Sequence, residues 1–360
     1  MAAIKPGVLI ITPFFFPNIG GVETHLSDLT TELAKQNYQV YVQTYSPLTT
    51  PENYQPFEVS KNLYIRRYRW FGGNLFHILE KYPLLDFLYL TPYLFIRTFL
   101  WLIANHKKIQ TIHSHGFNAA FIGVIFSKIF HLRHITSTHA IYDHIGNLSQ
   151  KLVRYTLTQT DHILCLSNAS KKQLISWGVN PAKVSTYRYW IDLDRFSPAK
   201  LPNKFTFIFV GRLIVKKGIN LYLKLAHQFP QFNFLVVGTG PELSTVKKCP
   251  DVQYHGTNPQ YHFASALITP SLYAEGYGRV VMEAVACGLP VLASNLGGLP
   301  EALDNSVAIL VKPSLKNFSQ SIKKICQPEI YQNLQKNCRQ YALNKFSSKN
   351  ISLITSWYTT

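Results

Sequence analysis

Two glutamates flank a glycine-rich turn, and together they could bind hydroxyl groups or a phosphate. Glu275 stands before the turn, Glu283 lies within the helix predicted after it, and seven residues separate them. Gly276 and Gly278 let backbone N–H groups approach a ligand closely, as binding at a helix N-terminus requires. A lone glutamate beside such a turn is most often solvated, but two of them around one turn favour a binding site.

Other polar candidates come directly after apolar runs, where predicted strands end. Arg212 follows one such run, so a purely solvated role is disfavoured for it. His139 and His115 each close another run, although a histidine satisfied by neighbouring loop backbone explains His115 equally well. The pair Gly20 and Gly21 precedes a predicted helix, and by itself such a pair is a weak signal.

The strands that would carry these residues alternate with helix-length stretches, a rhythm typical of parallel sheets covered by helices. In the first half the predicted strands span residues 8–12, 38–44, 110–113, 134–137, 162–166 and 183–187. In the second half they span residues 205–210, 233–237, 266–270 and 290–293. Each half opens with a strand that runs into a glycine loop, and open α/β folds bind ligands at this edge of the sheet. Two such edges, facing each other, predict one central cleft.

A polar stretch with two prolines separates the two halves and predicts the domain boundary. We expect an N-terminal Rossmann-like domain over residues 1–191, a linker over residues 192–203 and a C-terminal Rossmann-like domain over residues 204–342. Residues 343–360 are expected to form a C-terminal helix that returns to the N-terminal domain.

The composition of the chain limits its partners and its surroundings. Thirty-six Lys and Arg against eighteen acids give a net charge of +18, which favours nucleic acid, anionic lipid headgroups or phosphorylated substrates as partners. Five scattered cysteines without paired metal-ligand spacing favour a reduced compartment, and hence a cytoplasmic location. The apolar stretch over residues 87–104 is interrupted by Pro92 and Arg97, which predicts a surface-lying or buried helix rather than a membrane span.

A basic and aromatic stretch between Lys61 and Lys108 predicts peripheral binding to an anionic membrane surface on its cytosolic face. Its basic and aromatic residues adjoin one another in a cluster, which consists of Arg66, Arg67, Tyr68, Arg69, Trp70 and Phe71. Basic residues near an anionic surface contribute about 1 kcal/mol each, and aromatic side chains prefer the interface. The alternative is that part of residues 93–104 is a buried core helix with only its charged ends exposed.

Three motifs, in order along the chain, resemble those of the retaining glycosyltransferase family 4. The Glu275–Gly278 turn with Glu283 is similar to its E-G-[FY]-G signature with the second Glu, and residues 211–218 are similar to its G-R-L-x-x-x-K-G motif. Residues 20–25 resemble its G-G-x-E-x-H element. The resemblance covers essentially the whole chain and implies the α/β GT-B fold, with two Rossmann-like domains facing a central cleft. The opening loop looks especially like members that glycosylate phosphatidylinositol, although many polysaccharide-biosynthesis members share it.

The resemblance implies a role for each matching residue in the transfer of a sugar from a nucleotide diphosphate sugar. Glu275 would contact hydroxyls of the donor sugar, and Glu283 would bind the ribose hydroxyls. Arg212 and Lys217 would hold the donor diphosphate, and His139 would touch the donor sugar, with His115 a second candidate. The remaining donor-binding positions implied in this way are Gly20, Gly21, Gly238, Gly276, Tyr277 and Gly278. The N-terminal domain would face a lipid-linked or glycan acceptor.

Neither a metal nor a cofactor is expected. Asp192 and Asp194 look like the metal-binding D-x-D of another glycosyltransferase fold, but they lie in the predicted linker. Two fixed cations, Arg212 and Lys217, can stabilise a leaving diphosphate without a metal ion. The Asn-Gly turn usual for the family is absent from residues 187–192.

Other classes remain as alternatives. A nucleic-acid-binding protein could use the +18 charge and the many aromatic residues, but no such motif is present, and Glu275 and Glu283 would have no purpose. A GT-B sugar-nucleotide enzyme without a glycan acceptor is a second alternative. One such enzyme, a phosphorylase, would need a pyridoxal-binding lysine, and no sequence feature identifies one. A degenerate, non-catalytic partner protein is disfavoured because the motif residues are all present.

Overall fold

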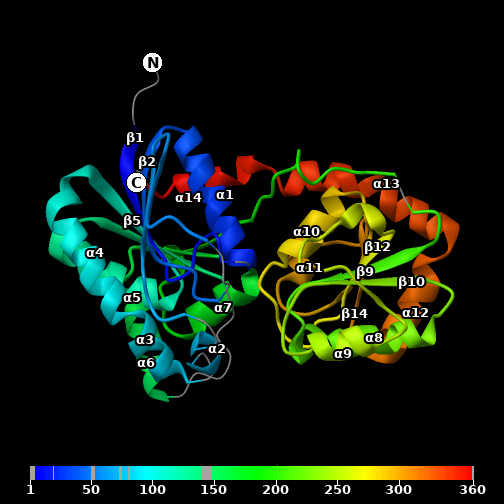
Figure 1. Cartoon of the computed structure of the whole chain (residues 1–360). Coiled ribbons are helices and arrows are strands. Elements are labelled where there is room, and N and C mark those ends of the chain that lie inside the picture. Colours follow the sequence, from blue (N-terminus) through cyan, green and yellow to red (C-terminus); the bar gives the residue numbers. More distant parts are fainter. Residues whose placement is uncertain are drawn as a thin grey trace. The chain divides into compact units, whose positions relative to one another are not determined.

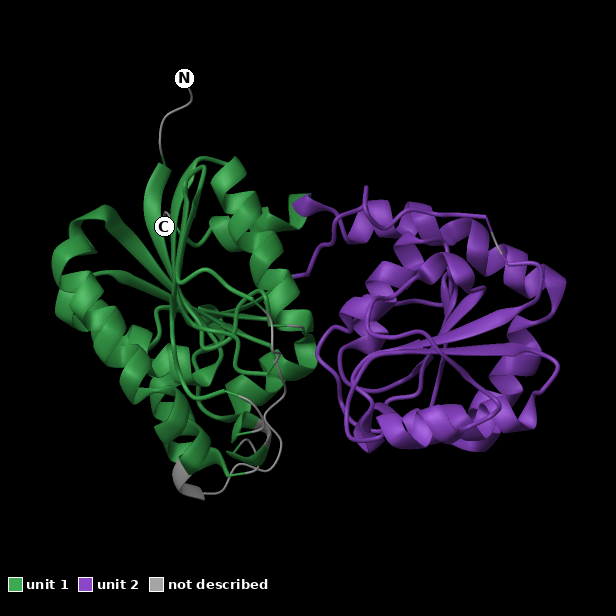
Figure 2. Ribbon diagram, in the orientation of Figure 1, with its two compact units in different colours: residues 1–187, 349–360 green, residues 188–348 purple. Residues whose placement is uncertain are grey.

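The computed structural model describes residues 5–18, 20–49, 53–72, 75–79, 82–139, 147–200 and 202–358. The chain divides into two compact units, one formed by residues 1–187 and 349–360 and the other by residues 188–348 (Figure 2). The division falls at residue 187, whereas the sequence placed it at residue 191. The stretch predicted as a linker therefore groups with unit 2, and the segment grouped with unit 1 begins at residue 349 instead of 343.

Unit 1 is built on an eight-stranded sheet in the order β3-β4-β2-β1-β5-β6-β7-β8. Its strands are β1 (Lys5–Ile11), β2 (Tyr38–Tyr45), β3 (Phe57–Ser60), β4 (Leu63–Tyr68), β5 (Ile109–His115), β6 (Arg133–Thr138), β7 (His162–Cys165) and β8 (Val184–Thr186). All neighbours are parallel except the β3–β4 hairpin. The inner strands were predicted as apolar runs, but the β3–β4 hairpin was not.

Helices cover both faces of this sheet, with α4 and α5 on one side and α1 and α7 on the other (Figure 1). The helices of unit 1 are α1 (Gly21–Lys35), α2 (Leu75–Leu79), α3 (Pro83–Leu90), α4 (Pro92–Asn105), α5 (Phe117–Phe130), α6 (Asn147–Gln159), α7 (Asn168–Ser176) and α14 (Ser352–Thr355). Three short 3-10 turns are at His106–Lys108, Pro181–Lys183 and Ser348–Ile351. The apolar side chains of both layers cover the sheet and hide it from water, so its strands read as nearly continuous apolar runs.

Unit 2 has a six-stranded, fully parallel sheet in the order β11-β10-β9-β12-β13-β14. Its strands are β9 (Thr206–Val210), β10 (Asn233–Val237), β11 (Gln253–Tyr254), β12 (Ala266–Thr269), β13 (Val291–Ser294) and β14 (Ala308–Val311). Its helices are α8 (Ile219–Gln228), α9 (Leu243–Lys248), α10 (Arg279–Ala286), α11 (Leu299–Ala302), α12 (Leu315–Ile325) and α13 (Pro328–Lys345), with 3-10 turns at Val215–Lys217 and Tyr261–Phe263.

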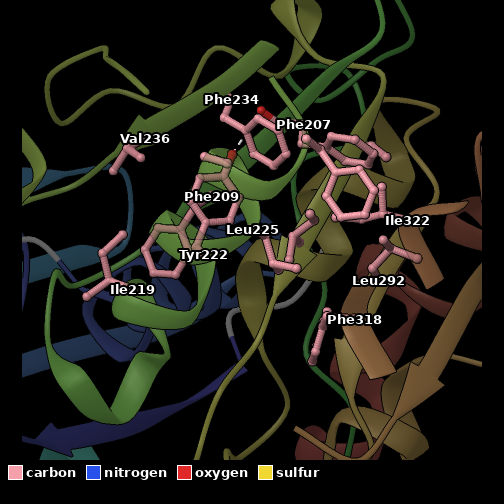
Figure 3. Packing of buried hydrophobic residues seen from close by; sticks show 14 of the residues in the cluster. Phe207, Phe209, Ile219, Tyr222, Leu225, Phe234, Val236, Leu292, Phe318 and Ile322 are labelled. Carbon is pink, nitrogen blue, oxygen red and sulfur yellow. Dashed lines mark hydrogen bonds between the residues drawn. The ribbon is translucent and has the colours of Figure 1, made fainter. Parts of the chain in front are cut away.

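The core of unit 2 is rich in aromatic rings (Figure 3). Phe207 and Phe209 of β9 and Phe234 of β10 pack against α8, and Phe318 of α12 belongs to the same buried cluster. Tyr222 is fully buried, and its hydroxyl lies 3.0 Å from the carbonyl oxygen of Phe207 and 2.8 Å from that of Leu235, so that the two carbonyls share its single proton. Because a buried hydroxyl without a partner is costly, these bonds explain how a tyrosine is accommodated there.

The stretch Pro83–Lys108 has the length and apolar composition of a membrane-crossing helix, and no other helix within the described ranges does. A core helix of a soluble protein meets the same criteria. In the fold the stretch is broken into α3 and α4 at Thr91, and Leu90, Leu94 and Leu102 pack into the core of unit 1. Its opposite side is also apolar: Ile96, Leu100 and Ile103 are 53%, 58% and 53% exposed.

The arginine and aromatic cluster before this stretch is divided: Arg66, Arg69 and Phe71 are exposed, whereas Arg67 and Tyr68 are buried, which corrects the part of the membrane argument that used these two. Arg67 is buried; its Nη1 lies 2.9 Å from a carboxylate oxygen of Glu58, and its Nε donates to the carbonyl of Phe16. Trp70 stacks on Tyr93, with ring centroids 4.5 Å apart. Arg67 and Trp70 make these contacts within unit 1, so their presence in the sequence does not require a lipid surface.

Candidate functional site

The candidate residues of unit 2 lie on the two loops that follow the central strands β9 and β12. From β9 the chain continues to β10 on one side, and from β12 to β13 on the other, so the strand order reverses between them. Open α/β sheets bind ligands outside the carboxyl ends of the strands at such a switch point. The loop over residues 211–218 follows β9, and the loop over residues 270–278 follows β12.

The two loops touch through their backbones. The N–H of Leu272 donates to the carbonyl of Lys216 at 2.8 Å. Gly218 has a φ of 78°, and a Cβ there would lie 2.0 Å from the carbonyl oxygen of Pro270. A residue with a side chain would therefore push the loops apart. This contact fixes the distance between the lysine of the first loop and the glutamate of the second.

Lys217 and Glu275 form an ion pair, with Nζ 2.5 Å from Oε2. The other carboxylate oxygen of Glu275 accepts the hydroxyl proton of Ser271, and the carboxylate is buried. Burial disfavours the charge on Lys217, but the carboxylate of Glu275 and the nearby Tyr273 outweigh it and hold the pKa of Lys217 above its ordinary value. The site therefore presents a fixed cation and a fixed carboxylate side by side.

Two side chains bind Glu283, one from α10 itself and one from a segment that precedes this helix in the chain. Arg279 lies one helical turn earlier and places Nε 2.9 Å from Oε1, while the hydroxyl of Tyr261 donates to Oε2 at 2.8 Å. Burial raises the pKa of Glu283 although both partners oppose the shift. A carboxylate can accept about four hydrogen bonds, so two bound partners leave capacity for a diol.

Arg212 is exposed, and no residue of the described chain pairs with its guanidinium. It begins the loop after β9, five residues before Lys217. An exposed arginine keeps all its donors available, and its planar fork suits a phosphate. The two cations predicted from the sequence thus lie on one loop, one of them already paired and the other open.

Three further positions implied by the resemblance have structural duties. Gly278 caps α10 with a φ of 72°, which a residue without Cβ adopts at little cost. A Cβ on Gly238 would lie 1.9 Å from the carbonyl oxygen of Gly211, so this glycine keeps the two loops at the ends of β9 and β10 in contact. Tyr277 is buried, its ring packs near Tyr189, and burial raises its pKa to about 12. Gly276, between Glu275 and Tyr277, is partly exposed.

The candidate residues of unit 1 also gather at a switch point, which here lies between β1 and β5. Gly20 and Gly21 begin α1 after β1, His115 ends β5, and His139 directly follows β6. His115 Nδ1 lies 3.0 Å from His139 Nε2. His25 of α1 completes the group, with its ring centroid 6.2 Å from that of His139. The sheet therefore brings His115 and His139 into contact, and both belong to one cluster.

Burial sets the protonation of this cluster. It lowers the pKa of His139 to about 3, and that of His115 well below its ordinary value, with neighbouring histidines adding to the second shift. Both rings are therefore neutral at physiological pH. A neutral imidazole can donate one hydrogen bond and accept another, but it cannot act as a positive charge against a phosphate.

Sequence reasoning assigned no role to several residues that hold the site. Arg279 could have been found, because an arginine four residues before a glutamate on one helix faces it. Ser271 lies four residues before Glu275 in the same loop, but no helical spacing in the sequence would pair them. Tyr261 and Tyr273 carried no local signal, since they meet Glu283 and Lys217 only through the fold.

Asp192 and Asp194 are both exposed and lie at a turn in unit 2. A carboxylate oxygen of Asp192 accepts the backbone N–H groups of Asp194 and Arg195, both at 3.0 Å, and so caps a turn. Across the described residues, no group of three or more His, Cys, Asp or Glu side chains could hold a metal ion.

Comparison with known proteins gives the class. The chain matches Glycosyltransferase Family 4 over residues 19–195 and Glycosyl transferases group 1 over residues 191–345. It is similar to a component of human phosphatidylinositol N-acetylglucosaminyltransferase, with 27% identity over 88% of this chain and 68% of that protein. Among solved structures, it is similar to sucrose-phosphate synthase from Thermosynechococcus elongatus, with a TM-score of 0.79, 20% identity and 98% of both chains covered. A HepE structure from Anabaena in complex with UDP-glucose gives a TM-score of 0.76, 16% identity and 98% coverage of both chains.

The two sheets, their switch-point loops and these matches define a glycosyltransferase with the GT-B fold. The chain belongs to glycosyltransferase family 4. The predicted fold class and family are thereby confirmed, and the matches to sugar transferases favour the predicted function over the nucleic-acid-binding alternative.

Proposed function

We propose that this chain moves a sugar from a uridine diphosphate sugar to phosphatidylinositol or a related membrane lipid. The observation that carries the proposal is the Lys217–Glu275 pair at the switch point of unit 2, with Glu283 held on the next helix. The human relative is named for N-acetylglucosamine transfer to phosphatidylinositol, and the Anabaena structure holds UDP-glucose. UDP-N-acetylglucosamine is therefore the first donor to test.

In the proposed mechanism, Arg212 and Lys217 bind the donor diphosphate and stabilise the charge that develops on it as the sugar leaves. Lys217 is held in place by Glu275 and Arg212 has its donors available, so the two cations could stabilise the diphosphate without a metal ion. Glu275 accepts hydrogen bonds from the sugar hydroxyls, and Glu283 accepts those of the ribose.

Transfer with retention follows in this proposal without a protein nucleophile. Glu275 is bound to Lys217 and Ser271, and a carboxylate engaged in this way is a weak nucleophile. The leaving phosphate oxygen takes the proton of the acceptor hydroxyl while the new bond forms on the same face of the sugar. The two-carboxylate scheme of retaining hydrolases is a different solution to the same problem.

A donor and acceptor screen tests the proposal. Purified chain is incubated with UDP-, GDP- and ADP-sugars, with and without phosphatidylinositol vesicles, and both free nucleotide and glycolipid are measured. We expect glycolipid to form with a UDP-sugar. Nucleotide release that no acceptor increases would favour the sugar-nucleotide enzyme without a glycan acceptor, and inactivity with every UDP-sugar would contradict the donor assignment.

The same proposal places the chain on the cytosolic face of an anionic membrane, as a peripheral protein. Its support is the outer side of α3 and α4, where Leu84, Leu88, Ile96, Leu100 and Ile103 are all exposed. A helix side that faces water normally carries polar residues. Apolar patches of this kind mark interaction surfaces, and the C-terminal end of α4 leads into exposed lysines that suit anionic headgroups.

Liposome flotation with matched variants tests this placement. Leu100→Ser with Ile103→Ser should reduce binding to phosphatidylglycerol vesicles by about 100-fold or more, because each loses an apolar side chain worth roughly 1.5–3 kcal/mol when buried, and about 1.4 kcal/mol is tenfold in affinity. Leu343→Ser, on the exposed side of α13 in unit 2, is the matched control and should bind as the wild type does. Binding of the wild type should weaken as salt is added. Equal flotation of all three proteins, or no flotation at all, would argue against this surface.

A further inference from the structure

Two pairs of polar side chains repeat along neighbouring strands of unit 1. In the register of β5 and β6, His113 is opposite Ile135 and His115 is opposite Ser137. His113 bonds to Ser137, two residues beyond its own partner, and His115 bonds to His139, again two residues beyond. Positions two apart on a strand face the same side of the sheet, so all four side chains share one face.

The C-terminal segment contacts this group of side chains at His113. The hydroxyl of Tyr358 lies 2.7 Å from His113 Nδ1, and the hydroxyl of Ser137 lies 2.8 Å from His113 Nε2. The backbone of Tyr358 is held as well, because its carbonyl accepts the hydroxyl of Thr111. Trp357 stacks on His162, with ring centroids 3.4 Å apart. His113 is therefore fixed at both nitrogens.

The fixed His113 ring in turn packs on His115. Their ring centroids lie 4.1 Å apart, and both residues are buried. His115 can thus neither rotate toward His113 nor move to solvent without breaking the packing. Its hydrogen bond to His139 therefore connects the packed rings of His113 and His115 to the candidate donor-sugar residue.

The proton on the His115–His139 bond can be assigned by elimination. Both rings are neutral, so one must donate from the nitrogen it contributes and the other must accept. Among the described residues, His115 Nε2 is buried without a partner. A buried N–H without an acceptor is rarer in proteins than an under-used acceptor. His115 therefore carries its proton on Nδ1 and donates to His139 Nε2, which leaves the proton of His139 on Nδ1.

We propose that His115 is a positioning residue that fixes the tautomer and orientation of His139, and that Tyr358 holds His113 and His115 in the arrangement this requires. The inference rests on the proposed function in one respect, since the contact of His139 with the donor sugar is itself part of that proposal. In this arrangement the N–H of His139 is on Nδ1. A C-terminal residue thereby contributes to the site through two buried rings.

The test compares two substitutions of His115 in the full chain. His115→Leu removes the donor, whereas His115→Asn keeps an N–H at nearly the position of Nδ1. We expect His115→Leu to lower kcat by about 10- to 100-fold with little change in donor KM, and His115→Asn to restore most of the loss. Tyr358→Phe, which removes only a hydroxyl, should lower kcat less. His131→Asn, at an exposed left-handed position that asparagine suits, is the matched control.

A substrate-free measurement separates this inference from the proposed function. In ¹⁵N spectra of the imidazoles, assigned with His139→Gln, wild-type His139 should be the Nδ1–H tautomer, and His115→Leu should convert it to a mixture. Wild-type kcat in His115→Leu, or an unchanged His139 signal in that variant, would overturn the inference. If the tautomer shifts as expected but His139→Gln keeps full activity, the positioning holds and the role proposed for His139 fails.

Discussion

Acidification from about pH 7.5 to about pH 5 should destabilise unit 1 through its buried histidines. Burial lowers the pKa values of His113, His134 and His139 to about 3, against roughly 6.5 in an unfolded chain. Between these two values the unfolded chain binds protons that the folded chain does not. The contribution of these neutral histidines to the free energy of unfolding is therefore fully present above about pH 6.5 and is lost as the pH falls toward about 3.

The magnitude follows from the shift. About pH 5 lies roughly 1.5 units below the pKa of a histidine in the unfolded chain, so protonation of each one lowers the free energy of unfolding by about 2 kcal/mol. The three histidines together lower it by about 6 kcal/mol. That is comparable with the whole stability of an ordinary domain, about 5–15 kcal/mol. Unit 1 should therefore be close to unfolding at a pH at which most proteins are stable.

Urea unfolding followed by circular dichroism across this pH range measures the effect, and His134→Gln isolates one contribution. His134 is buried beneath α5 and bonds to Ser114, outside the proposed site. The variant should be less stable than the wild type at neutral pH, and the difference should shrink by about 2 kcal/mol at about pH 5. A difference that does not change with pH would refute the reasoning, because it would mean that His134 does not remain neutral in the folded chain.

Three further outcomes are expected. Glu283→Ala should raise the donor KM by about 10- to 100-fold through loss of the ribose contacts, whereas Glu275→Ala should chiefly lower kcat; wild-type kinetics in both, from initial rates, would contradict the site assignment. Activity should survive EDTA, and its loss with rescue by manganese or magnesium would overturn the metal-independent mechanism. Gly238→Ala should destabilise unit 2 by roughly 2–4 kcal/mol in urea unfolding, because its φ is 141° and its Cβ would meet the carbonyl of Gly211; unchanged stability would show that the loop can shift freely.

The strands could be predicted where both faces of the sheet are buried. Most inner strands of both sheets are nearly continuous apolar runs because helices cover both faces. Strands β3, β11 and β14 lie at sheet edges and were not predicted, since short, partly exposed strands lack that pattern. The inner strand β4 was not predicted either, because Arg66 and Arg67 interrupt its apolar residues.

The attachment of the predicted linker to unit 2 could not be predicted from the sequence either. A polar stretch with two prolines looks like a free linker, but Phe196 packs near Tyr261, and Arg339 donates to the carbonyls of Leu193 and Phe196. These contacts attach residues 193–196 to unit 2. The arginine lies more than 140 residues away along the chain, so composition alone could not reveal the attachment.

By itself the sequence determined the family, the GT-B fold class and the residue types of the candidate site, because glycine turns, strand ends and the spacing of Glu275 and Glu283 are local features. Only the tertiary structure decided that Tyr358 meets His113, that His115 bonds to His139, and that Tyr261 holds Glu283. It also turned Arg67 inward, against the expectation of a membrane-facing cluster. The physical reason is that such contacts depend on strand order and register, which bring together side chains that no local pattern connects.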